Sequence, residues 1–313
     1  MKKERQQRIS GKRYGIFAVL FFCVAAGGAG LLLKDHINKE QAQNYYEDLT
    51  LQVNAATPTP TEESKVAPIN VGEPVVSEPE LTEKELLQQQ YLAAVPQNNI
   101  DWETLKAENE DVYAWITVPG TTVDYPIVQH ATDNGYYLTH TLDGKTAKAG
   151  SIYTENYNKK DFSDNHTVIY GHNLTVGTMF SSLHSFDKAD LTNEEHLFYI
   201  YTEDNTLVYQ IFAAYEFPAK HLLLNYELYN IYVYEQYLKD IISGYDCRPG
   251  GLHNIREGVE LGLEDKIVTL STCTNDHNKA YRFLVVGKLV AEANPSAEQT
   301  LTEMEALQGT DGK

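Results

Sequence analysis

The distribution of apolar and polar positions divides the chain into three regions. Residues 14–33 form one uncharged, apolar run. Residues 54–82 are polar and contain five prolines, a composition that cannot bury a core and is typical of an extended stalk. From about residue 100 to about residue 290, short apolar runs alternate with turn residues, as in a compact folded domain.

Most apolar runs of the third region are short and rich in Val, Ile, Tyr and Thr, which predicts β-strands. Pro-Gly, Asp-Asn-Gly and Asp-Gly turn signals separate several of them, and the pair around Glu203-Asp-Asn205 predicts a hairpin. We therefore expect a mostly β fold, a closed or nearly closed barrel with helices around it. The predicted strands are Val112–Val118, Val123–Val128, Gly150–Glu155, Thr167–Tyr170, Leu197–Tyr201, Leu207–Tyr215, Lys266–Thr272 and Tyr281–Val290.

Four segments depart from the β pattern and predict helices. Residues 34–53 are polar with helical character. Thr82–Ala94 begins with a good N-cap residue, and Asp101–Asp111 carries acidic residues early, where the helix dipole favours them. In Tyr226–Ser243, apolar residues recur at helical spacing, which predicts an amphipathic helix of about four turns before the Lys266–Thr272 strand.

The apolar run at 14–33 predicts a membrane anchor. Its twenty residues would form a helix of about 30 Å, the thickness of the hydrocarbon core of a bilayer. Residues 1–13 contain six basic residues and one acidic residue, so the positive-inside rule places them in the cytoplasm. Three alternatives are weaker. A cleaved signal peptide would have a shorter apolar core, a lipoprotein would have a small residue in place of Phe22 before Cys23, and a buried core helix is unusual beside a basic terminus.

Charge limits the functional classes. The formal net charge is −19 and residues 1–13 contribute +5, so the rest of the chain carries −24. Nucleic acid binding requires a basic surface and is excluded. After the anchor we expect a stalk at 34–83, a catalytic domain at 84–292 and an acidic tail at 293–313. The protein is expected in the cell membrane with a single span, a cytoplasmic N terminus and an extracellular catalytic domain.

Candidate chemistry lies at the ends of three predicted strands. The run that begins at Lys266 ends in the thiol of Cys273, and Val168-Ile-Tyr-Gly precedes the imidazole of His172. Arg282 interrupts the apolar strand that follows Cys273, a position where a guanidinium is costly unless it meets an anion or a carbonyl. A thiol, an imidazole and a guanidinium are the parts of a thiol acyl-transfer enzyme.

The remaining cysteines and histidines receive structural interpretations. Cys247 lies in a Gly/Pro-rich loop, and a disulfide between Cys247 and Cys273 is the alternative to a nucleophilic thiol. Asn165-His166 and His253-Asn254 are interpreted as loop residues. No metal-spaced Cys pair, His-Glu-x-x-His or Gly-rich phosphate loop occurs, so neither a metal nor a cofactor is expected.

Several of these segments together resemble the sortase family, over roughly residues 100–290. Thr269-Leu-Ser-Thr-Cys273 followed by Arg282 is similar to the sortase signature, and Ile169-Tyr-Gly-His172 with Met179-Phe180 downstream is similar to its histidine segment. Several features favour class B. They are the helix and strand predicted over Asp101–Ile116 at the start of the domain, the helix at 226–243, and the segments Asp133-Asn-Gly-Tyr-Tyr-Leu138 and Gly150-Ser-Ile-Tyr153. The interval from Cys273 to Arg282 is one residue shorter than in some relatives.

The resemblance implies the eight-stranded sortase β-barrel and a cysteine transpeptidase. Cys273 would be the nucleophile, His172 the general acid/base, and Arg282 the group that positions the substrate and stabilises the oxyanion. Asn134, Leu138 and Ser271 match positions that line the sorting-signal groove. The implied partners are secreted proteins with a C-terminal sorting motif, cleaved at a Thr carbonyl through a thioacyl intermediate, and a cell-wall amine from peptidoglycan precursor as acceptor.

Other functions remain open at this stage. A pilin-polymerising sortase would use a Lys amine as acceptor, and a secreted cysteine peptidase would pass the acyl group to water. A cysteine L,D-transpeptidase would show a Ser-His-Gly-Cys segment, whereas this chain has Ser271-Thr-Cys. A surface binding module with a merely buried Cys273 would differ from all of these in having an inert thiol.

Overall fold

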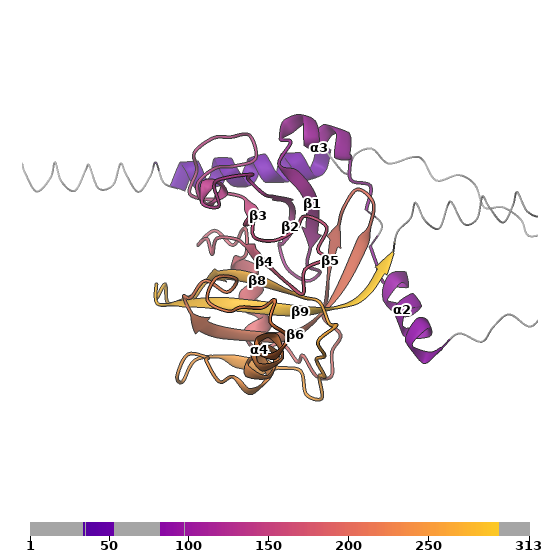
Figure 1. The fold of residues 1–313 in the computed structure, drawn as a ribbon. Helices are drawn as coiled ribbons and strands as arrows, with labels where there is room; N and C mark the ends of the chain where they lie inside the picture. Colours follow the sequence, from indigo (N-terminus) through magenta and orange to yellow (C-terminus); the bar gives the residue numbers. More distant parts are fainter. Residues whose placement is uncertain (1–33, 35, 53–81, 97, 294–313) are drawn as a thin grey trace, which may run out of the picture.

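The computed structural model describes residues 34, 36–52, 82–96 and 98–293 (Figure 1). Residues 36–52 are helical, and α- and 3-10 helices and strands follow in the order α2 Glu83–Ala93, α3 Trp102–Glu108, β1 Val112–Thr117, β2 Asp124–Val128, η1 Tyr136–Leu138, β3 Ile152–Thr154, β4 His166–Tyr170, η2 Ser181–Asp187, β5 Leu197–Tyr201, β6 Thr206–Pro218, α4 Ile231–Ser243, β7 His253–Ile255, β8 Ile267–Cys273 and β9 Tyr281–Ala293.

The strands form one sheet that closes on itself. Their order is β5-β1-β2-β3-β4-β8-β9-β6-β7, and β5 also pairs with β6, so eight strands make a ring to which β7 adds outside β6. Most neighbours are antiparallel, but β2–β3 and β4–β8 are parallel. The expected fold class, a mostly β eight-stranded barrel with helices, is confirmed.

Strand β8 and the part of β9 from Phe283 to Gly287 are buried on both faces of the sheet. Val268, Leu270 and Val285 point into the barrel core, whereas Ile267 and Val286 belong to a second cluster outside it. Alternate residues of a strand face opposite sides of the sheet, so burial on both sides requires a continuous apolar run. Helix α4 provides the outer cover and packs against this side of the sheet through Tyr234, Tyr237, Leu238 and Ile241 (Figure 1).

Local signals set the ends of the helices. Thr82 and Glu85 form a capping box at the start of α2, which confirms the predicted N-cap. The α4 helix begins later than predicted, at Ile231, because the Asn230 side chain caps it by accepting from the Tyr232 amide. It ends at Ser243, and Gly244, which follows, has a φ of +70° that suits the left-handed C-cap conformation.

Two sequence interpretations were wrong. His166, interpreted as a loop residue, is the first residue of β4 and is buried. Its Nε2 lies 2.8 Å from the Thr269 hydroxyl, and its ring is 5.4 Å from that of Tyr237 in α4. His253-Asn254 belongs to β7, a strand of three residues that is too short to show a pattern in the sequence.

Residues 36–52, within the segment we assigned as 34–83, form a helix that lies beside α3 (indigo in Figure 1). Ala42, Tyr46 and Leu49 are buried against the barrel, and the Tyr46 hydroxyl lies 3.0 Å from the Gly150 carbonyl and 2.9 Å from the Ser151 hydroxyl. No helix among the described residues is long and apolar enough to cross a membrane. The predicted anchor at 14–33, its flank at 1–13 and the tail from 294 onwards lie outside the described residues.

Candidate active site

Three neighbouring strands, β4, β8 and β9, bring the candidate residues to one end of the barrel. Cys273 is the cross-strand partner of Arg282 in the antiparallel β8–β9 pair, so their side chains project from the same face. In the parallel β4–β8 pair Tyr170 lies opposite Ser271, a register that brings His172 level with Cys273 just beyond the end of β4. These side chains belong to the outer face of the sheet, the face that α4 covers further along.

Cys273 is half-buried at the last position of β8, and its thiol is free. Cys247 is also free, so the alternative of a Cys247–Cys273 disulfide is not formed in this structure. Burial raises the pKa of the Cys247 thiol to about 11, helped by the charge of Asp246. A thiol protonated to that degree at neutral pH is a poor nucleophile, in keeping with a structural role for Cys247.

His172 is positioned by the turn that ends β4. A Cβ at Gly171 would come within 2.6 Å of the Phe180 ring and 2.7 Å of Ile152 Cδ1, so only glycine fits before the histidine. The Phe180 amide donates to the His172 carbonyl at 2.9 Å. The imidazole Nε2 lies 2.7 Å from the Leu138 carbonyl. Because a carbonyl only accepts, Nε2 carries the proton in this contact, which leaves Nδ1 free of a partner among the described residues.

Arg282 is half-buried at the second position of β9. Its Nη1 donates to the Lys279 carbonyl at 3.2 Å and to the Tyr281 carbonyl at 2.8 Å, within the turn that joins β8 to β9. Within the described part of the chain the other guanidinium nitrogens make no hydrogen bond. They remain able to donate to an oxygen of a bound substrate.

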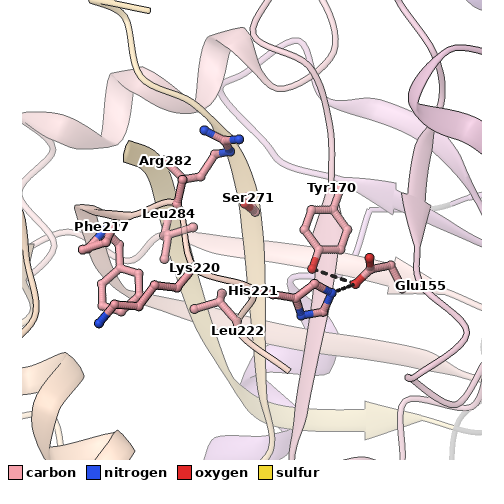
Figure 2. Close-up of a pocket in the computed structure, with 11 residues that line it drawn as sticks. Glu155, Tyr170, Phe217, Lys220, His221, Leu222, Ser271, Arg282 and Leu284 are labelled. Atoms are coloured by element: carbon pink, nitrogen blue, oxygen red, sulfur yellow. Dashed lines mark hydrogen bonds and ion pairs between the residues drawn. The ribbon is translucent and has the colours of Figure 1, made fainter. Parts of the chain in front are cut away.

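A pocket of about 190 Å³ lies beside these residues on the outer face of the sheet (Figure 2). Ser271 and Arg282 form one wall, and the segment that follows β6 forms the other. Phe217 at the end of β6 and Leu222 of this segment are buried in the cluster on the outer face of the sheet, which holds the segment against the sheet. The lining residues are Glu155, Tyr170, Phe217, Pro218, Ala219, Lys220, His221, Leu222, Ser271, Arg282 and Leu284.

One end of the pocket is polar. His221 Nε2 lies 2.7 Å from Glu155 Oε2, and the Tyr170 hydroxyl donates to the same oxygen at 3.0 Å (Figure 2). The contact of His221 with Glu155 is an ion-pair distance without hydrogen-bond alignment. Burial and then the charge of Glu155 raise the pKa of Tyr170, so its hydroxyl stays protonated and can donate. This end offers both acceptors and donors to a polar side chain.

The predicted groove residues occupy different places. Ser271 is buried to 6% exposure in the pocket wall. Leu138 is 45% exposed and contacts His172 through its carbonyl, and Asn134 Oδ1 accepts from the Asn156 amide at 2.8 Å. Neither Leu138 nor Asn134 lines the pocket.

Sequence reasoning missed Glu155 as a pocket residue. The family resemblance placed further groove residues near Phe217–Leu224 but did not assign Phe217 or His221 individually, because this stretch follows a strand and shows neither helical nor strand periodicity. Among the described residues, no group of three or more His, Cys, Asp or Glu side chains could hold a metal ion.

The closed barrel, with a free thiol, an imidazole and a guanidinium at the ends of three neighbouring strands, is the architecture of a cysteine-dependent acyl-transfer enzyme. The family model of the sortase domain matches residues 116–290, more than half of the chain. The chain therefore belongs to the sortase family, whose members are cysteine transpeptidases.

Its relatives are class B sortases. The chain is 32% identical over 190 residues to sortase B of Listeria monocytogenes, which covers 60% of this chain and 73% of that protein. Among solved structures, sortase B of Clostridium perfringens matches with a TM-score of 0.51 and 32% identity, over 60% of this chain and 98% of that one. A class B sortase of Streptococcus pyogenes involved in pilus biogenesis matches with a TM-score of 0.50 and 31% identity, over 60% of this chain and 97% of that one.

Proposed function

We propose that this class B sortase cleaves a C-terminal sorting motif of secreted proteins at a Thr carbonyl and transfers the acyl group to a cell-wall amine. Cys273 is the nucleophile, His172 the general acid/base, and Arg282 the oxyanion and substrate-positioning group. The observation that carries the proposal is the pairing of Cys273 with Arg282 across β8–β9, at the level of His172 beyond β4.

The reaction follows from these three groups. The Cys273 thiolate attacks the Thr carbonyl and forms a C–S bond, and negative charge develops on the carbonyl oxygen. His172 protonates the leaving amine as the peptide C–N bond breaks, which leaves a thioacyl enzyme. The incoming amine then attacks the thioester, His172 accepts its proton, and Cys273 leaves as thiolate.

Arg282 contributes in the steps where negative charge develops. The guanidinium nitrogens other than Nη1 are free to donate to the oxyanion, in a site from which bound peptide would exclude water. Loss of one such donor typically lowers the rate by about 10²–10³. Arg282→Lys keeps the charge but not the planar fork of donors, so most of this loss is expected in that variant too.

The pocket beside Ser271 and Arg282 is proposed to hold a side chain of the sorting motif upstream of the Thr. Ser271 lies two residues before Cys273 on the same face of β8, so a peptide bound at the thiol passes over this pocket. Asn134 and Leu138 remain proposed groove residues. The contact of the Leu138 carbonyl with His172 supports Leu138, and the resemblance of the 133–138 segment to class B sortases supports Asn134.

The topology is also a proposal. Residues 14–33 would anchor the protein in the cell membrane with 1–13 in the cytoplasm, 34–83 as a connecting segment, 84–292 as the extracellular catalytic domain and 293–313 as a tail. The length of the uncharged run and the basic flank support this arrangement. It places the enzyme where secreted substrates emerge.

The test is a peptide panel. Full-length protein is incubated with quenched sorting-motif peptides of the NPQTN and LPXTG types, with and without triglycine, and the products are read by mass spectrometry. Amide product that requires Cys273 is expected. Cys273→Ala should abolish turnover, whereas Cys247→Ala, the matched control at the other described thiol, should retain it. Turnover that survives Cys273→Ala would overturn the assignment, and free acid as sole product in the presence of amine would favour a peptidase.

A pilin-polymerising role is the second candidate. One structural relative, from Streptococcus pyogenes, is a class B sortase involved in pilus biogenesis. In that case a Lys side-chain amine would replace the wall amine as acceptor. Deletion of the gene distinguishes the two roles, because loss of high-mass pilus ladders indicates polymerisation and loss of single wall-linked proteins indicates anchoring.

A further inference from the structure

The backbone carbonyl of Cys273 accepts hydrogen bonds from side chains. If β4 continued beside β8, a main-chain amide would take this place. Along β8 the carbonyls alternate between its neighbours β4 and β9, and the Ser271 carbonyl accepts from the Gly171 amide at 3.1 Å. The next carbonyl facing β4 is that of Cys273. The main chain has turned away by then, because Asn173 pairs with Met179 in an isolated bridge instead of continuing β4.

Two side chains take the place of the missing amide. Asn173 Nδ2 donates to the Cys273 carbonyl at 3.1 Å, and His184 Nε2, from η2, reaches the same oxygen at 3.0 Å. The second proton of Asn173 Nδ2 goes to Asn275 Oδ1 at 3.1 Å. Both lone pairs of the Cys273 carbonyl are therefore used.

The protonation state of His184 follows from this arrangement. A carbonyl accepts only, so Nε2 carries a proton, and the 3.2 Å approach of Asn173 Nδ2 to His184 Nε2 is a contact between two donors. Burial lowers the pKa of His184, although its bond to the Cys273 carbonyl opposes this shift, so the neutral ring is favoured. The contact with the carbonyl then assigns its proton to Nε2. The ring stacks on Phe283 with centroids 4.2 Å apart, which sets its orientation.

The same loop also carries the candidate acid/base. Asn173 directly follows His172, whose carbonyl is held by the Phe180 amide at 2.9 Å. The Asn173 side chain thus ties the loop that bears the imidazole to the strand end that bears the thiol. No other hydrogen bond among the described residues joins the loop 172–180 to Cys273.

We propose that Asn173 and His184 are positioning residues that clamp the Cys273 carbonyl and thereby fix the thiol relative to His172. This inference rests on the proposed function of Cys273. Neither side chain touches the reacting atoms. They act through the backbone of Cys273, where a displacement of about 1 Å can lower a rate by about 10².

The variants separate the hydrogen bonds from the packing. Asn173→Ala removes one donor, and His184→Phe removes the other while keeping a ring to stack on Phe283. His184→Gln keeps an N–H donor without the ring, and Ser185→Ala is the matched control, since Ser185 is exposed beside His184. In each full-length protein we would measure kcat and KM for aminolysis, the melting temperature, and the rate of Cys273 alkylation by iodoacetamide from peptide mapping.

Asn173→Ala and His184→Phe are each expected to lower kcat about 10- to 100-fold with KM changed less than about twofold, and to alter Cys273 alkylation. His184→Gln should recover most of the kcat lost in His184→Phe, and Ser185→Ala should match wild type. If Asn173→Ala and His184→Phe keep the kcat and the Cys273 alkylation rate of wild type, the clamp is overturned. It is also overturned if kcat falls only in proportion to the melting temperature and His184→Gln recovers none of it.

The two proposals fail differently. If wild-type protein shows no Cys273-dependent turnover, the proposed function fails, and the alkylation rates still test the clamp. If wild type turns over and the donor-deleting variants do so equally well, only the clamp fails.

Discussion

The burial of His166 predicts that the folded protein loses stability in mild acid. The side chain is fully enclosed between β4, β8 and α4, its Nε2 is paired with the Thr269 hydroxyl, and its Nδ1 has no partner in the described structure. Burial lowers the pKa of His166 from 6.5 to about 3. The imidazole is therefore neutral in the folded protein at every pH at which the protein is ordinarily handled.

The sign follows from proton binding. Between about pH 6.5 and pH 3 the unfolded chain binds a proton at this site and the folded chain does not, so stability is present above pH 6.5 and is lost as the pH falls. One pH unit corresponds to about 1.4 kcal/mol, and the fall from pH 6.5 to pH 5 therefore costs about 2 kcal/mol. This contribution comes from His166 alone.

The assay compares wild type with His166→Gln, which does not titrate, by urea unfolding at pH 7 and pH 5. The fluorescence of Trp115, buried in the barrel core, reports unfolding. Wild type should lose about 2 kcal/mol more than the variant between the two pH values, whatever their difference at pH 7. His277→Asn, at an exposed turn position with φ of +54°, is the control and should behave as wild type. Equal losses in wild type and His166→Gln would refute the reasoning.

Three further predictions concern packing and thiol chemistry. Tyr46→Phe removes the hydroxyl that contacts the buried Ser151 hydroxyl and Gly150 carbonyl, and should lower the free energy of unfolding by about 1–3 kcal/mol. The control is Tyr45→Phe, which should cost less because its partner Glu108 is exposed. Equal losses in the two variants would argue against the docking of helix 36–52. Gly287→Ala would bring a Cβ within 2.3 Å of Phe198 Cε1 and should cost about 1–3 kcal/mol, whereas Gly135→Ala meets only ordinary contacts and should change stability by less than about 0.5 kcal/mol, as urea unfolding can show. In Cys273→Ala, alkylation of Cys247 should be slow at pH 8 and should rise about tenfold per pH unit towards its pKa of about 11; a rate at pH 8 equal to that in urea would contradict its burial.

The strands that carry the candidate site were predictable because they are long and covered on both faces. The predicted start and end of β9 agree with the structure to within a few residues, and β8 ends at Cys273 as expected. A strand such as β7, with three residues and partial exposure, leaves no such pattern. His166 was misread because its sequence neighbours are polar, while its actual surroundings come from Thr269, 103 residues further along the chain, and from Tyr237, 71 residues further along.

The sequence by itself determined the elements and the chemistry they carry: alternating and continuous apolar runs that form a barrel, and strands that end at a thiol and an imidazole or begin beside a guanidinium. These properties depend on neighbouring residues, so a linear reading reveals them. The tertiary structure alone decided which distant segments meet. The parallel pairing of β4 with β8 brings His172 level with Cys273, and the return of the chain after β6 sets His221 against Glu155 in the pocket. Such contacts depend on closure of the barrel, a property of the whole chain that no local pattern encodes.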